Sequence, residues 1–413
     1  MKKFLSILLT MAMIFSLVAC GGNNTNSGSS TNSGSTSNSS ADSGSANDAE
    51  PIRVGVVGTM TGENSLFGDV LAKTIKLLVE QKNAEGGVLG RPIEIYEYDT
   101  RDDAVETTNA ARKAILNDKV VAFIGTDASA TTISLIEVAT EYGVPVISGI
   151  STNNKIIEAD DGSVREYSFR AGMTDVQTGQ VLGEYCVKKM GYKNIAIIYE
   201  IGSDLSVGLA EKFTASAEAN GGKIVCSEAY NTGDVDYRAT LTRIKNAGDF
   251  DALFIAAGYH KQIGLIAKQA RDLGIEQPFV TSHGAGSDNL FAIAGDSVEG
   301  MIFNLAVDVK SPNVKTLLAD FIEMWGYDPS INVGPDCYMA SDCLTMLIEG
   351  IKAANSTDPE AIRDALENMT EFEGLTCTVR LNPETHACFR DMPIMQVKNG
   401  AFETIDIFTP TVS

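Results

Sequence analysis

Two short segments of the sequence are dense in hydroxyl side chains, and each precedes a stretch with helical periodicity. They are residues 125–132 (GTDASATT) and residues 148–153 (SGISTN). Hydroxyls and free N–H groups that converge at the start of a helix favour a carboxylate ligand. For either segment alone, N-capping of the following helix is the simpler interpretation, because Ser and Thr cap many helix starts.

The patterns that would indicate catalysis or a metal site are missing from the sequence. Residues 55–62 (GVVGTMTG) lack the G-x-G-x-x-G spacing of dinucleotide sites, and neither a phosphate-binding P-loop nor a G-x-S-x-G elbow occurs. The histidines are His260, His283 and His386, and no C-x-x-C pair accompanies them. We therefore expect no enzyme activity, no cofactor and no metal.

The cysteines leave one question open. Cys377 and Cys388 flank a turn-like segment, residues 382–385 (NPET), so they either face each other across a hairpin as a disulfide or remain free. For the other cysteines that follow Cys20 we expect buried free thiols; these are Cys186, Cys226, Cys337 and Cys343.

The N-terminus has the layout of a secretory signal. Lys2 and Lys3 precede a mostly apolar stretch, residues 4–19, which is short for a membrane span and ends at Cys20. Residues 17–20 (LVAC) resemble a bacterial lipobox, in which a lipidated cysteine becomes the first mature residue. This predicts a lipoprotein signal peptide over residues 1–19 and a lipid anchor on Cys20. An ordinary signal peptide is the alternative.

The segment that follows, residues 20–50, is rich in Ser, Gly and Asn and predicts a flexible linker. The rest is too long for one typical core and predicts two lobes. A formal net charge of −22 argues against nucleic acid as a partner.

The body of the chain alternates short β-branched runs with amphipathic stretches, which is the pattern of an α/β fold with parallel sheets. A first set of strands is expected at residues 52–57, 93–98, 120–124 and 144–147, separated by helices at 70–84, 104–117 and 132–142. A second set of strands is expected at 195–199, 223–226, 252–256 and 279–281. Later helices are expected at 314–325, 335–354 and 359–369, the last with Asp358 as its N-cap.

In such sheets ligands bind where strands end and loops lead into helices. The loops in question are residues 59–68, 125–131, 148–154, 200–208, 257–261 and 282–287.

Several of these loops, taken in order, resemble the leucine/isoleucine/valine-binding proteins of ABC importers. The segments that carry the resemblance are residues 54–62 (VGVVGTMTG), 83–90 (NAEGGVLG), 98–100 (YDT), 143–148 (GVPVIS) and 258–260 (GYH). The resemblance runs from about residue 52 to at least residue 303.

This resemblance implies a type I periplasmic-binding-protein fold, in which two doubly wound parallel-sheet lobes close on a ligand about a hinge. Three crossover segments would fall near Arg170, near Leu305 and past Glu373. Lobe 1 would then comprise residues 51–170 with 306–373, and lobe 2 residues 171–305 with 374–413.

The resemblance also implies ligand-binding residues. Ser129 and Thr152 match the hydroxyls that hold a ligand carboxylate in the family. Phe67 matches an aromatic residue over the ligand side chain, and Tyr259 matches a pocket tyrosine.

Two positions depart from the family pattern. The family's ammonium-binding glutamate falls on His283, and a second pocket tyrosine falls on Leu205, in residues 203–206 (SDLS). A buried ammonium ion without an anionic partner is costly, so we expect a carboxylate ligand that lacks the usual ammonium or has its cation held elsewhere. Asp127 is the alternative anionic partner, unless it faces water and caps the helix.

The sequence therefore predicts an extracytoplasmic solute-binding lipoprotein that binds an amino acid, of branched-chain type by family, or a related small carboxylate. Its partner would be an ABC permease in the membrane, to which it would be anchored on the outer face. A ligand-sensing receptor with the same fold and a signalling partner is the alternative.

Overall fold

The computed structural model describes residues 50–62, 65–328 and 334–411 of the chain. All of them belong to one compact unit, Ser45–Ser413. The expected signal peptide, Cys20 and the expected linker up to residue 49 lie outside the described residues. Among the residues that are described, no helix has the length and apolar composition needed to cross a bilayer.

The first sheet is five-stranded and wholly parallel, in the order β2-β1-β3-β4-β5. The interior strand β1 has nearly all of its residues buried, and a continuous apolar run is what a strand covered on both faces requires. Each expected strand of the first set is present, with ends shifted by up to two residues. The bounds are β1 Ile52–Gly58, β2 Ile93–Asp99, β3 Ala122–Gly125, β4 Val146–Ser148 and β5 Ser168–Arg170.

The second sheet is seven-stranded, in the order β15-β14-β10-β9-β8-β6-β7. Neighbouring strands from β7 to β10 are parallel, whereas β14 and β15 join as antiparallel strands at one edge. The bounds are β6 Asn194–Glu200, β7 Lys223–Tyr230, β8 Ala252–Ala256, β9 Phe279–Thr281, β10 Ile302–Asn304, β14 Met392–Lys398 and β15 Ala401–Phe408. The predicted α/β class with two parallel-dominated sheets is thus confirmed.

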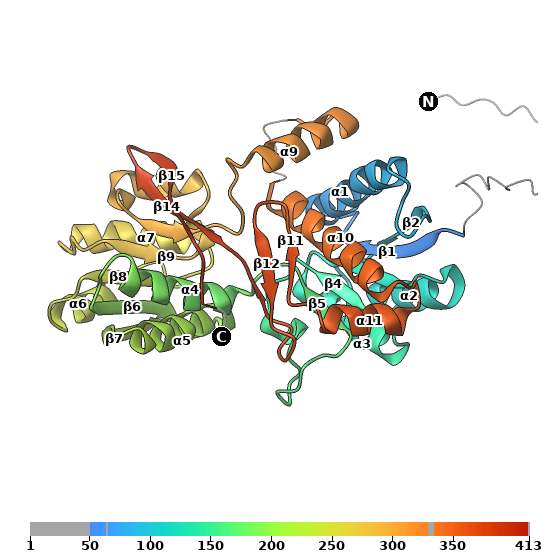
Figure 1. Ribbon diagram of the computed structural model, residues 1–413. Coiled ribbons are helices and arrows are strands. Elements are labelled where there is room, and N and C mark those ends of the chain that lie inside the picture. The colour runs from blue at the N-terminus through green and yellow to red at the C-terminus, as the bar shows by residue number, and fades with distance from the viewer. Residues whose placement is uncertain (1–49, 63–64, 329–333, 412–413) are drawn as a thin grey trace, which may run out of the picture. The chain divides into compact units, whose positions relative to one another are not determined.

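Helices lie against both sheets, and a small antiparallel sheet, β11-β12-β13, stands apart from them (Figure 1). The helices are α1 Ser65–Ala84, α2 Ala104–Lys113, α3 Ser129–Glu141, α4 Asp175–Lys188, α5 Asp204–Ala219, α6 Arg238–Asn246, α7 His260–Asp272, α8 Asn289–Ala294, α9 Pro312–Trp325, α10 Gly334–Ala354 and α11 Pro359–Glu367. The small strands are β11 Glu371–Glu373, β12 Thr378–Leu381 and β13 Cys388–Phe389. Asp358 caps α11 as predicted, since its Oδ1 accepts hydrogen bonds from the backbone N–H groups of Glu360 and Ala361 at 3.1 Å.

The chain passes three times between the elements of the two large sheets. It leaves the first sheet after β5, returns after β10 so that α10 packs against α1, and finally enters the second sheet again at β14 (Figure 1). We call the elements around the first sheet lobe 1 and those around the second sheet lobe 2. These passages bring residues that are distant in the sequence to the same place.

None of the six cysteines in the described part of the chain forms a disulfide. Cys388 pairs with Leu381 in the β12–β13 register, whereas Cys377 precedes β12, so the two cysteines are not opposite each other. Cys377 and Cys388 therefore do not form the disulfide that the sequence left open. Of the four cysteines expected to be buried, Cys226 is only half-buried, because it lies on the edge strand β7.

Candidate functional site

The N-terminus of α3 is not capped by a side chain. Its N-cap residue is Ala128, which offers no side-chain acceptor, and Ser129 is the first helical residue. The Ser129 hydroxyl instead accepts a hydrogen bond from the backbone N–H of Asn153 at 3.4 Å, which joins the two hydroxyl-rich loops. The first N–H groups of α3 therefore remain without the side-chain acceptor that N-capping would supply.

The other hydroxyls of these loops are bonded to one another. Thr132 contacts both Thr126 and Ser151 at 2.7 Å, and Thr126 also contacts Thr131 at 2.7 Å, all in buried positions. This network fixes the shape of the loops after β3 and β4. Most of the hydroxyls in the two segments therefore stabilise the loops through these hydrogen bonds.

Two further residues of the expected site lie at the same edge of lobe 1. The Oδ1 atom of Asp127 accepts a hydrogen bond from the backbone N–H of Thr59 at 2.7 Å, so this carboxylate ties the loop after β3 to the loop after β1. Phe67, in the first turn of α1, is 46% exposed and available for contact with a ligand or partner.

In lobe 2 the corresponding loops meet closely. A Cβ atom on Gly284 would lie 2.2 Å from the carbonyl oxygen of Gly258, so the loops after β8 and β9 can approach this closely only because position 284 is glycine. Leu205 packs against Gly258 from the start of α5. Tyr259 projects from this cluster and is 69% exposed.

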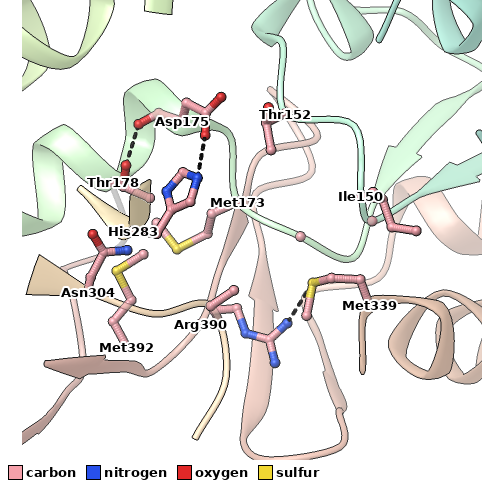
Figure 2. Close-up of a pocket in the computed structure, with 13 residues that line it drawn as sticks. Ile150, Thr152, Met173, Asp175, Thr178, His283, Asn304, Met339, Arg390 and Met392 are labelled. Carbon is pink, nitrogen blue, oxygen red and sulfur yellow. Dashed lines mark hydrogen bonds and ion pairs between the residues drawn. The ribbon is translucent and has the colours of Figure 1, made fainter. Parts of the chain in front are cut away.

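A cavity of about 180 Å³ brings residues of both lobes together. Thr152 reaches it from lobe 1 and His283 from lobe 2, whereas the other expected residues do not line it in the described part of the chain. The cavity is shown in Figure 2, and its lining residues are Gly149, Ile150, Thr152, Gly172, Met173, Asp175, Thr178, His283, Asn304, Ala306, Met339, Arg390 and Met392.

Asp175 is the carboxylate of this cavity. Its Oδ1 atom lies 3.6 Å from Nε2 of His283, and its side chain is 14% exposed (Figure 2). Asp175 is the first residue of α4, after a capping box formed by Thr174 and Gln177, and its backbone N–H donates to the carbonyl of Thr152 at 3.3 Å. A negative charge at this helix N-terminus is favourable. The cavity thus places a hydroxyl, a carboxylate and an imidazole together.

The segment that carries Asp175 is held by a buried arginine. The Nε atom of Arg170 donates to the carbonyl of Gly172 at 2.9 Å, and Nη2 donates to the carbonyl of Met173 at 3.3 Å. Burial lowers the pKa of this guanidinium. Arg170 therefore fixes the first crossover and the start of α4.

Arg390 lies at the far end of the cavity from Asp175 (Figure 2), and it forms a buried ion pair with Asp342. Nη1 of Arg390 is 2.9 Å from Oδ2 of Asp342, and the side chains are 1% and 0% exposed. Burial raises the pKa of the Asp342 carboxyl, an effect that the Arg390 guanidinium opposes. Since Asp342 belongs to α10 and Arg390 lies between β13 and β14, this pair joins lobe 1 to the third crossover.

Several cavity residues were not predicted from the sequence. They lie in the crossover segments, at the ends of the elements next to them, or on α10, and include Met173, Asp175, Asn304, Met339, Arg390 and Met392. The one local signal was the capping box before Asp175, which marks a helix start in the first crossover. Within the described residues, no three His, Cys, Asp or Glu side chains gather closely enough to hold a metal ion.

Comparison with known proteins gives the family. Residues 51–401 match the model of a family described as periplasmic binding protein. The chain belongs to this family. Membership implies a place of action outside the cytoplasm and a role in binding solutes.

Named relatives share a similar length. The chain is 29% identical to a leucine-, isoleucine-, valine-, threonine- and alanine-binding protein of Pseudomonas aeruginosa, over 78% of this chain and 83% of that protein. It is 27% identical to the crystal structure of a leucine-binding protein from Thermotoga maritima, with a TM-score of 0.65 and coverage of 87% and 99%. It is also 25% identical to LivJ, a branched-chain amino acid transporter substrate-binding protein of Streptococcus pneumoniae solved with isoleucine, with a TM-score of 0.66 and coverage of 87% and 100%.

Proposed function

We propose that this chain is the solute-binding component of an ABC importer and that it captures a free amino acid between its two lobes. One observation carries this proposal: Thr152, Asp175 and His283 line the same cavity. A hydroxyl next to the uncapped start of α3 suits the ligand carboxylate, and the carboxylate of Asp175 suits the ammonium group. The protein has no catalytic role in this proposal, and it delivers its ligand to a permease.

The histidine at position 283 supplies no negative charge for a ligand ammonium group, and in this proposal the carboxylate of Asp175 supplies it instead. An ammonium ion needs a nearby anion, and the Asp127 carboxylate already accepts the Thr59 N–H on the lobe 1 side. Asp175 lies 3.6 Å from His283 and faces the same cavity, so the charge of the family's glutamate is supplied from α4.

A thermal-shift screen tests the proposed function. A ligand at a hundred times its dissociation constant adds about 2.7 kcal/mol of stability, which raises the melting temperature measurably. We expect stabilisation by apolar L-amino acids. The absence of any shift with the twenty standard amino acids would contradict the proposed ligand class.

Thr152 lines the cavity, and Ser129, which does not line it, is bonded to the adjoining loop at Asn153; we propose from the family resemblance that both hydroxyls bind the ligand carboxylate. Replacing either with alanine should weaken binding by about 1.5 to 3 kcal/mol, because each change removes a hydrogen bond to a charged group. Isothermal titration calorimetry with the identified ligand measures the effect. Ser134→Ala, at a half-buried position of α3 that does not line the cavity, is the control and should leave affinity unchanged. If both Ser129→Ala and Thr152→Ala stay within a factor of about two of the parent affinity, the assignment is wrong.

We also propose that lipid on Cys20 anchors the protein to the outer face of the membrane, on the basis of the lipobox resemblance. Acyl chains contribute about 0.8 kcal/mol for each buried methylene group, so they hold the protein firmly. Cys20→Ser should release the protein from the membrane fraction or leave the signal uncut. A parent protein found in the soluble fraction with residues 1–19 intact would contradict the anchor.

A further inference from the structure

Two loops that the sequence singled out do not line the cavity between the lobes. Residues 200–208 and 257–261 each follow a strand of the second sheet, yet none of them is among its lining residues in the described part of the chain. Glu200 and Lys261, from these two loops, instead line a second cavity of about 100 Å³. This second cavity lies within lobe 2 and shares no lining residue with the first.

The second cavity is at the carboxyl end of the edge strand β7. Glu200 and Tyr230 are the last residues of β6 and β7, and they are paired in the parallel register of these strands. Lys261 and Gln262 come from the first turn of α7. The carboxyl ends of parallel strands are where such sheets bind ligands, and here the fold brings four polar side chains together.

The loop between β7 and α6 forms a fixed wall of this cavity. The Tyr237 hydroxyl donates to the carbonyl of Asp234 at 2.6 Å, and its backbone N–H donates to Oε1 of Gln269 at 2.7 Å. Nε2 of Gln269 donates in turn to the carbonyl of Val235 at 2.9 Å. The ring of Tyr237 packs edge-on against that of Tyr230, with 4.9 Å between the centroids. These contacts preorganise the cavity.

Two polar atoms of the lining residues have no hydrogen-bond partner in the described part of the chain. They are the hydroxyl oxygen of Tyr230 and the Oε1 atom of Gln262, and both atoms are buried. The Tyr230 side chain belongs to a residue that is only 3% exposed. Buried polar atoms without partners are destabilising, so a bound molecule that supplies the missing partners is favoured.

The cavity also contains charged groups. Burial raises the pKa of the Tyr230 hydroxyl, and the nearby Glu200 carboxylate raises it further. The carboxylate of Asp234 already accepts the backbone N–H of Asn231 at 2.8 Å. Lys261 lines the same cavity but forms no ion pair with Glu200 among the described residues. The Glu200 carboxylate therefore remains available to a ligand.

A primary ammonium group matches this set of acceptors. It carries three N–H donors, and the acceptors are the Glu200 carboxylate, Oε1 of Gln262 and the hydroxyl oxygen of Tyr230. The faces of tyrosine rings also attract cations. The volume of about 100 Å³ exceeds the share of one water molecule in the liquid, which is about 30 Å³, so a small organic ammonium ion fits.

We propose that the second cavity binds the primary ammonium group of a small molecule. This site goes beyond the capture of an amino acid between the lobes and does not depend on it. The ammonium group belongs either to a simple alkylamine or to a small amino acid such as glycine. Lys261, which is exposed, distinguishes the two, because its charge repels an alkylammonium ion and attracts the carboxylate of an amino acid.

NMR of the protein with ¹³C-labelled tyrosine rings tests the proposal. Methylammonium chloride is expected to shift the Tyr230 and Tyr237 resonances in a saturable way. Tetramethylammonium chloride at equal ionic strength carries the same charge without N–H donors and should bind at least about tenfold more weakly. Tyr142, at the end of α3 in lobe 1, should not respond to either ion. Equal binding of both ions, or no saturable shift with methylammonium, would overturn the proposal.

Two variants test the assigned acceptors. Glu200→Gln should weaken methylammonium binding by about tenfold or more, and Tyr230→Phe, with Tyr237 as the reporter, by about fivefold. Asp236→Asn is the matched control, because it removes an exposed carboxylate that lies on the neighbouring loop and does not line the cavity. An affinity of Glu200→Gln within a factor of about two of the parent would refute the site, even if Tyr230→Phe fails to fold.

Glycine and Lys261→Gln identify the source of the ammonium group. If Lys261→Gln strengthens methylammonium binding by about twofold and weakens glycine binding at the Tyr230 and Tyr237 reporters, the ligand is a small amino acid. If glycine fails to bind there, or binds equally well to Lys261→Gln, the ligand is a simple amine. Both results support an ammonium site, whereas the failure of both probes overturns it. Leucine binding at the first cavity is measured separately, so the loss of one site leaves the other testable.

Discussion

Replacing Asp175 with asparagine is expected to weaken the binding of free amino acids by about 2 to 5 kcal/mol, because a largely desolvated ammonium group would lose its anionic partner. That corresponds to a reduction in affinity of roughly thirty- to several thousandfold. Asparagine keeps the size of the side chain and removes only its charge. Calorimetry with leucine measures the change.

Two comparisons isolate the charge effect. Asp249→Asn removes a carboxylate from an exposed loop and should leave affinity unchanged. The 2-keto counterpart of leucine has no ammonium group, so Asp175→Asn should not weaken its binding. An equal loss of affinity for the amino acid and the keto acid would show that Asp175 does not act through the ammonium.

The loss of a favourable charge at the start of α4 should cost only about 0.3 to 1 kcal/mol of stability, so Asp175→Asn is expected to remain folded. The complementary change, His283→Glu, restores the glutamate that the family pattern has at this position. It should not improve amino acid binding, because the new carboxylate would repel Asp175, whose Oδ1 lies 3.6 Å from the present imidazole. A clear gain in affinity would mean that Asp175 is not the principal anionic partner.

Asp342→Asn is expected to lower the free energy of unfolding by about 3 to 5 kcal/mol, since it leaves the guanidinium of Arg390 buried without a counter-charge. Both side chains are 1% exposed or less. Asparagine retains an acceptor for the backbone N–H of Leu375, which donates to Asp342 Oδ1 at 2.6 Å, so the charge is the main change. Urea unfolding followed by circular dichroism gives the measurement.

A neighbouring ion pair supplies the matched control. Nη2 of Arg380 lies 3.0 Å from Oδ1 of Asp391, but these side chains are 25% and 28% exposed. Asp391→Asn should therefore cost only about 0 to 1 kcal/mol. The double change of Asp342→Leu with Arg390→Met should also cost far less than Asp342→Asn, because no unpaired charge remains. Similar losses for the buried and the half-exposed pair would contradict the assigned role of burial.

Hydrophobic periodicity and the cap at Asp358 determined the order and type of most elements. These signals act over a few residues, because a strand or helix buries one face of a local stretch of chain. The alternation of strands and helices then predicted parallel sheets, and the two large sheets are parallel except for β14 and β15. Helix starts were less accurate: α3 begins at Ser129, three residues before the periodic pattern, since the uncapped first turn contains small residues without an apolar signal.

The assembly of the cavity was decided only by the tertiary structure. Sequence reasoning predicted Thr152 and His283 one by one, through a resemblance, and it did not predict Asp175, Met173, Met339 or Met392 as cavity residues. Those residues lie in or next to the crossovers and on α10, and they meet because the chain passes three times between the sheets.

Two further features were decided only by the tertiary structure. One is the buried ion pair of Arg390 with Asp342, and the other is the separation of Cys377 from Cys388. Burial of the ion pair depends on packing between α10 and a segment near the C-terminus, and the separation of the cysteines depends on the β12–β13 register. Local composition carries no information on either, because register and long-range packing are set by contacts between residues far apart in the chain.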